Sequence, residues 1–87
     1  MNDYEWDESK RLSNVAKHRI DFAAVNEFEW ETAHAEESDR YGEIRYAATG
    51  YIGSRLHRVI YTIRGDRKRI ISIRKASPRE MREYAQA

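Results

Sequence analysis

The chain has 87 residues, of which 40% are hydrophobic and 36% are charged, and its formal net charge is +1. This length fits one domain, and the chain is too rich in tyrosine, tryptophan, isoleucine and valine to be disordered. It contains no cysteine and no apolar run of the roughly 18 residues that a membrane helix needs, which excludes disulfides, thiolate metal sites and a membrane-spanning helix.

The N-terminal segment is acidic and lacks the apolar stretch of a secretory signal, so we expect a cytoplasmic protein. The aromatic residues 4–6 predict a short strand. Asp7 can cap a helix over residues 8–18, and Asp21 can cap a shorter second helix over residues 22–28. The first of these helices has a narrow apolar stripe at helical spacing: Leu12, Val15 and Ala16.

The middle of the chain alternates strand-like runs with turn residues. Strands are predicted over residues 29–37 and 44–52, with a turn between them. Two further runs, residues 56–64 and 68–75, are rich in β-branched and aromatic residues, and each follows a short turn. Connections this short predict an antiparallel meander.

The last helix has the clearest start in the sequence. Ser77 is its predicted cap, Pro78 its first residue, and Glu80 completes an S-x-x-E capping box. Met81 and Tyr84 share a face that can dock on the sheet. The predicted order is a short strand, two helices, a four-stranded antiparallel sheet and a helix, which is an α+β domain with its helices packed against one face of the sheet.

Alternation along the two strongest strands separates apolar from basic side chains. It places Ile71 and Ile73 on the face that meets the helices and Ile70 on the opposite, open face. The open face then carries three guanidinium and two hydroxyl groups: Arg58, Thr62, Arg64, Ser72 and Arg74. Lys75 ends its strand and is assigned to neither face. Three further basic residues are expected at the last turn: Arg67, Lys68 and Arg69.

Two interpretations of this open face stand side by side. Guanidinium groups suit a phosphate backbone, because their planar fork bonds two oxygens at once. A solvated antiparallel face is also usually polar and often charged, and alternation alone favours this second interpretation. Residues 1–40 carry 11 acids and 5 bases, whereas residues 41–87 carry 4 acids and 11 bases. The basic half suits a polyanion partner, although the acidic half could simply neutralise it.

Histidine is the remaining source of chemistry in the sequence. The three histidines are scattered and have no cysteine partners, so we predict no metal and no cofactor. His34 is expected on the surface, and His57 on the apolar face of its strand. His18 follows Lys17 at the end of the first helix, where the helix dipole favours a cationic ring. This favours a C-terminal cap over a role in proton transfer.

Three segments, in order along the chain, carry a recognisable pattern. Residues 5–22 follow W-D-x-x-K-x-x-x-N-x-x-K-H-x-[IV]-x-F through Trp6, Asp7, Lys10, Asn14, Lys17, His18, Ile20 and Phe22. The central segment matches at Gly42, Glu43, Arg45 and Gly50. The last segment matches at Tyr61, Thr62, Arg64, Arg69, Ile70, Ile71, Ser72, Arg74, Lys75, Ala76, Arg79, Glu80 and Tyr84. Through these segments nearly the whole chain resembles the BrnT family of bacterial type II toxins.

This resemblance implies a RelE-like fold and a ribonuclease that arrests translation. It also implies a BrnA-like ribbon-helix-helix antitoxin, encoded beside the toxin. The complex would contact operator DNA only through this antitoxin. The catalytic candidates that it implies are Lys17, His18, Arg64, Arg74 and Lys75. The RNA-binding candidates are Arg45, Arg58, Thr62, Ser72 and Tyr84.

The expected chemistry is metal-independent attack of a ribose 2′-hydroxyl on the adjacent phosphate, which needs a base, an acid and stabilisation of a negative phosphorane. Arg64 and Arg74 could stabilise the phosphorane. Lys17, His18 or Glu43 could move the protons. One rival is a non-catalytic module that binds nucleic acid through the same face. Another is an interaction protein whose basic face meets an acidic partner helix.

Overall fold

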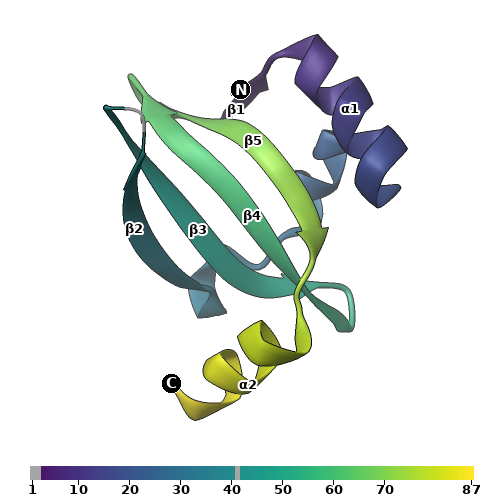
Figure 1. The fold of residues 1–87 in the computed structure, drawn as a ribbon, viewed down its shortest axis with the longest axis vertical. Helices are drawn as coiled ribbons and strands as arrows, with labels where there is room; N and C mark the ends of the chain where they lie inside the picture. Colours follow the sequence, from purple (N-terminus) through teal and green to yellow (C-terminus); the bar gives the residue numbers. More distant parts are fainter. Residues whose placement is uncertain (1–2, 41) are drawn as a thin grey trace.

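The computed structural model of the chain describes residues 3–40 and 42–87 (Figure 1). Five strands form one sheet in the order β1-β5-β4-β3-β2. The strands are β1 (Tyr4–Trp6), β2 (His34–Arg40), β3 (Glu43–Ile52), β4 (Arg55–Arg64) and β5 (Arg67–Lys75). The helices are α1 (Glu8–His18), the 3-10 helices η1 (Phe22–Glu27) and η2 (Trp30–Thr32), and α2 (Pro78–Gln86).

The α+β class and the C-terminal helix are confirmed, but three details of the prediction are wrong. The short strand predicted over residues 4–6, which the prediction allows as an addition to the sheet, is present as β1. It joins the sheet parallel to β5, so the sheet is mixed and five-stranded rather than four-stranded and antiparallel. The second helix is the 3-10 helix η1, and the segment expected to open the next strand forms η2 instead. β2 continues through Ser38 to Arg40, so most of the expected turn is strand, while Tyr41 lies outside the described residues.

The helices also do not share one face of the sheet. η1 covers one face, α1 packs along β5, and α2 meets the opposite face through the side chains described below (Figure 1). Within the described residues, no helix has both the length and the apolar character needed to cross a bilayer.

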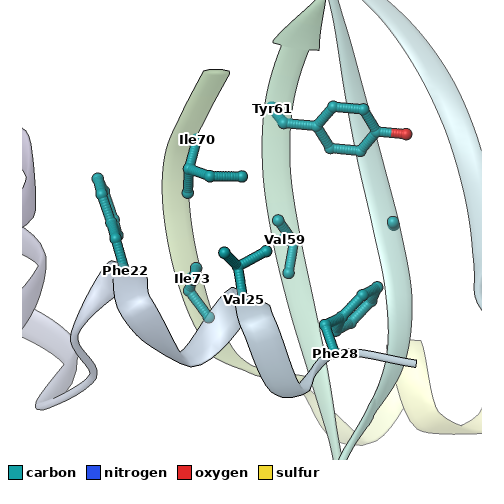
Figure 2. Close-up of a cluster of buried hydrophobic side chains, with 8 residues drawn as sticks. Phe22, Val25, Phe28, Val59, Tyr61, Ile70 and Ile73 are labelled. Carbon is teal, nitrogen blue, oxygen red and sulfur yellow. The ribbon is translucent and has the colours of Figure 1, made fainter. Parts of the chain in front are cut away.

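The core lies between η1 and the central strands, as Figure 2 shows. Its labelled members are Phe22, Val25, Phe28, Val59, Tyr61, Ile70 and Ile73. Two of them, Ile70 and Ile73, share this face although they lie three residues apart. An irregularity in β5 explains this, because Ile70 pairs with Tyr61 and Ser72 with Ile60, leaving one extra residue between them. The prediction that Ile71 faces the core in place of Ile70 is therefore wrong.

α1 is attached to the sheet by a polar side chain. Asn14 is 6% exposed, and its amide donates hydrogen bonds to the carbonyl oxygens of Ile73 and Ile20, both at 2.9 Å. Its carbonyl oxygen accepts from the Ile73 N–H at 3.2 Å. β1 pairs only with the first part of β5, so Asn14 satisfies backbone groups further along that edge. The expected apolar stripe does not face the core, since Leu12 is 55% exposed and Ala16 is exposed.

Candidate functional site

A groove of about 180 Å³ runs between α1 and β5, and its lining is mostly polar and basic. It is lined by Lys10, Ser13, Asn14, Lys17, His18, Ile71 and Ser72. The first four of these residues share one face of α1, because Ser13, Asn14 and Lys17 follow Lys10 by three, four and seven positions. The turn that ends α1 adds His18, and the irregular part of β5 supplies the opposite wall. Two lysines and two hydroxyl groups that line one groove can bind an anion.

The environment of His18 favours its neutral ring. Burial is the main cause that lowers its pKa below the usual 6.5, and the positive charges of Lys17 and Arg74 lower it further. The neutral ring therefore predominates at pH 7. This direction is the opposite of the one expected for a cationic helix cap. The cap is Arg19, in the left-handed conformation with φ 62°, and its N–H donates to the Val15 carbonyl oxygen.

Arg74 lies beside this groove and is held by a carboxylate from α2. Its two terminal nitrogens donate to the two oxygens of Glu80, both at 2.8 Å. Arg58 pairs with Arg74 across the strands, and its Nε lies 3.2 Å from Glu80 Oε2. Arg58 also donates to Thr49 Oγ1 at 2.9 Å and to Glu36 Oε1 at 2.5 Å. The arginines of the predicted open face are thus largely neutralised within the chain.

Glu80 responds strongly to these contacts. Its pKa falls from the usual 4.5 to about 2, chiefly because the Arg74 guanidinium donates to it, with help from the Ser77 N–H and the Arg58 charge. The Ser77 N–H bond belongs to the predicted capping box, which is present. Glu80 therefore remains ionised at any physiological pH.

The far end of α2 is anchored by Tyr84, one of the RNA-binding candidates. Its hydroxyl donates to the Thr32 carbonyl oxygen at 3.1 Å. Its ring centroid lies 4.7 Å from that of His34 and 5.7 Å from that of Tyr51. The expected docking of this helix face through Tyr84 is confirmed. A second cavity, of about 280 Å³, opens between this helix and β2 to β4.

Arg64 lies at the other end of the sheet. It is six residues from Arg58 along β4, which corresponds to about 20 Å. There its Nη2 donates to Glu43 Oε1 at 3.4 Å, and Glu43 Oε2 lies 3.6 Å from Arg45 Nε. Thr62, in the same region, is buried and donates to the Ile44 carbonyl oxygen. The structure therefore does not bring Arg64 next to Arg74.

Of the predicted catalytic residues, Lys17 and His18 line the groove together with Ser72, and Arg74 lies two residues beyond Ser72 on β5. Lys75 is exposed and pairs with His57, whose neighbours in alternation face the core, so it points away from Arg74. The placement of the last basic residues in a turn is wrong: Arg67, Lys68 and Arg69 all belong to β5.

Sequence reasoning did not place four residues of the groove in the site, namely Lys10, Ser13, Asn14 and Ile71, and it missed the part that Glu80 plays on the sheet. Lys10 and Ser13 precede Lys17 by seven and four positions, and this helical spacing could have identified both. Glu80 was identified only as a helix cap, because the sequence alone does not show which strand residues face α2. Among the described residues, no three His, Asp or Glu side chains are grouped in a way that could hold a metal ion.

The groove and the fold define a small α+β protein with a basic, histidine-containing site. Residues 6–80 match the family described as ribonuclease toxin, BrnT, of type II toxin-antitoxin system. Because the match covers most of the 87 residues, the chain belongs to this family. The family consists of ribonuclease toxins, and membership implies a protein antitoxin as partner. No curated protein matches the chain.

Proposed function

We propose that this chain is a metal-independent endoribonuclease that inhibits translation by cleaving RNA. The observation that carries the proposal is the α1–β5 groove, which Lys17, His18 and Ser72 line together, with Arg74 two residues beyond Ser72 on β5. Family membership supports the reaction class, and the groove supports its location.

In the proposed reaction, neutral His18 takes the proton of a ribose 2′-hydroxyl as this oxygen attacks the adjacent phosphorus. Lys17 donates a proton to the 5′-oxygen as its bond to phosphorus breaks. Lys10, inside the groove, stabilises the negative charge of the phosphorane, and Arg74 adds positive potential from the adjoining part of β5. The products are a 2′,3′-cyclic phosphate on one fragment and a 5′-hydroxyl on the other.

The remaining candidates then hold the RNA strand away from the reacting phosphate. Arg64 and Arg45 lie at the far end of β4 and β3, on the path of a strand that runs along the sheet. Contacts of this kind fix the position of a nucleic acid without reading its sequence. Lys75 contributes long-range attraction for the polyanion.

We also propose a RelE-like fold, a cytoplasmic location, and a BrnA-like ribbon-helix-helix antitoxin that neutralises the toxin and carries the complex to operator DNA. Expression of the chain alone should arrest growth, and co-expression of the neighbouring gene product should relieve the arrest. Harmless expression of the folded chain would contradict this assignment.

Cleavage itself is tested with the purified chain, free of antitoxin, and RNA in excess EDTA. We expect fragments that end in 2′,3′-cyclic phosphates. Loss of cleavage in EDTA, with recovery on adding magnesium, would contradict the metal-independent reaction. RNA that binds with steep salt dependence but stays intact would instead support the non-catalytic module.

A further inference from the structure

The contacts of α2 with the sheet include the ion pairs of Glu80 and the packing of Tyr84, and none of the helix residues is buried. Glu80, in the first turn, bonds Arg74 and Arg58. Tyr84, in the last turn, donates to the Thr32 carbonyl oxygen. Elements with few buried apolar contacts separate from a fold at low free energy. The attachment of α2 is therefore of a kind that a competing anion can break.

The sheet beneath α2 offers a site for such an anion. Arg58 and Arg74 lie opposite each other on β4 and β5, and both reach the same carboxylate. Their side chains are 16% and 33% exposed. Arg74 offers Glu80 both terminal nitrogens of its guanidinium fork. Arg58 offers only its Nε, because its terminal nitrogens bond Thr49 and Glu36. A phosphate presents paired oxygens to a fork such as that of Arg74 as a carboxylate does. Glu80 thus occupies a position that also suits a phosphate.

The connection between β5 and α2 allows the helix to pivot. The Ala76 N–H is fixed to the Leu56 carbonyl oxygen at 3.0 Å, and α2 begins two residues later. The Ser77 N–H donates to Glu80 Oε1 at 2.8 Å, and Ser77 Oγ accepts from the Glu80 N–H at 3.2 Å. Because these two bonds lie within the capping box, a rotation before Ser77 keeps them both. Glu80 would keep a hydrogen-bond donor after leaving the arginines.

We propose that Arg58 and Arg74 form a binding site for a phosphate of the RNA backbone, which Glu80 occupies in the free chain, so that α2 swings away when RNA binds. This inference rests on the proposed function in that RNA is the ligand. Arg74 lies two residues beyond Ser72 on β5, a distance of about 7 Å along the strand, so a phosphate bound here places its neighbour close to the α1–β5 groove.

The test compares Glu80→Gln with Glu83→Gln, which removes the same charge from the same helix. Glu83 is exposed, and within the described residues its ion pair is with Arg79, which is also exposed. The probe is a 2′-O-methyl oligouridylate, which cannot be cleaved by 2′-hydroxyl attack. We expect Glu80→Gln to bind it about tenfold more tightly than wild type. The slope of the logarithm of the binding constant against the logarithm of the salt concentration should become steeper by about 0.7 for each added phosphate contact.

Glu83→Gln should bind within about twofold of wild type, because an exposed charge contributes little. Thermal unfolding of both variants establishes that each is folded at the temperature of the assay. Equal affinities of the two variants, or no measurable binding by either, would overturn the proposal.

A second measurement leaves Glu80 in place. The chain has no cysteine, so Asp66→Cys and Gln86→Cys provide two unique positions for spin labels, one at the β4–β5 turn and one at the end of α2. Saturating oligouridylate should change and broaden the distance distribution between the labels. An unchanged distribution would also overturn the proposal.

The two proposals can fail separately, because cleavage of unmodified RNA is measured on its own. Cleavage by wild type together with equal binding by the two variants would remove the phosphate site and leave the ribonuclease. Tighter binding by Glu80→Gln without any cleavage of RNA would remove the ribonuclease and leave the phosphate site.

Discussion

At the scale of single residues, two family positions are explained by packing rather than by chemistry. Asn14 bonds both backbone groups of Ile73 and so replaces a strand partner on β5. Gly50 lies where a Cβ atom would come within 2.8 Å of the Phe28 ring and 3.0 Å of the Ala33 Cβ. Both residues hold the sheet to its covering elements, and neither need touch RNA.

Asn14→Ala should lower the free energy of unfolding by about 2 kcal/mol, because it leaves buried backbone groups without partners. Denaturant unfolding measures this loss. Asn26→Ala is the matched control, since the amide of Asn26 makes one exposed bond within η1. Equal stability of the two variants would show that Asn14 is not a structural bridge.

Gly50→Ala should destabilise the fold by about 1 to 3 kcal/mol, because the added methyl group overpacks the core against Phe28. Phe28→Leu removes the obstructing ring atoms. In a double-mutant cycle by chemical denaturation, the combined variant should therefore lose less stability than the two single losses added together. Simple additivity would contradict the steric explanation.

At the scale of elements, α2 and the end of α1 carry two groups whose pKa values the fold lowers, Glu80 and His18. Arg74 connects them, because it bonds Glu80 on one side and lowers the pKa of His18 on the other. Protonation of either Glu80 or His18 is harder in the folded chain, so both make stability rise with pH.

The stability contributed by Glu80 should be complete above about pH 4.5 and should disappear as the pH falls toward 2, following the lowering of its pKa from 4.5 to about 2. A shift of this size corresponds to about 3 kcal/mol. The free energy of unfolding, measured at several pH values in this range, should therefore depend less steeply on pH in Glu80→Gln. In Glu83→Gln it should depend on pH as steeply as in wild type. The same slope in both variants would show that Glu80 is not held by the arginines in solution.

The His18 ring should titrate below its usual pKa of 6.5, because burial and two nearby cations disfavour its charged form. Lys17→Gln removes one of these cations and should raise the pKa toward 6.5 without restoring it. NMR titration of the imidazole resonances measures this directly. Lys75→Gln is the control, and an equal shift in that variant would mean that the effect is not local.

At the scale of the whole molecule, the sequence was informative wherever local patterns decide the structure. The caps at Asp7, Asp21 and Ser77 are confirmed, as are the two central hairpins. It failed where distant segments decide, because the irregularity at Ile71 depends on how β5 meets both β4 and α1. The pairing of Glu80 with two arginines likewise depends on where α2 lands, which no local pattern encodes.

The candidate site was predicted only in part for the same reason. The family pattern identified Lys17 and His18, and strand alternation identified Arg74 and Ser72. Alternation assigns a side chain to a face of the sheet and not to a place along the strand, so it grouped Arg64 with Arg74. The predicted turn after residue 64 could have separated them, because it puts Arg64 beside the turn and Arg74 seven residues beyond Arg67. Only the folded chain shows that one end of β4 lies beside α2 and the other beside Glu43.

The central claim, that the α1–β5 groove carries out RNA cleavage, is tested most directly by comparing His18→Ala with His34→Ala. Initial rates are measured on end-labelled RNA in excess EDTA, with folding checked by circular dichroism. Loss of the proposed general base should slow cleavage by about 100-fold or more. His34→Ala, which removes an exposed ring from β2, should not slow it. Cleavage by His18→Ala at the wild-type rate would contradict the account.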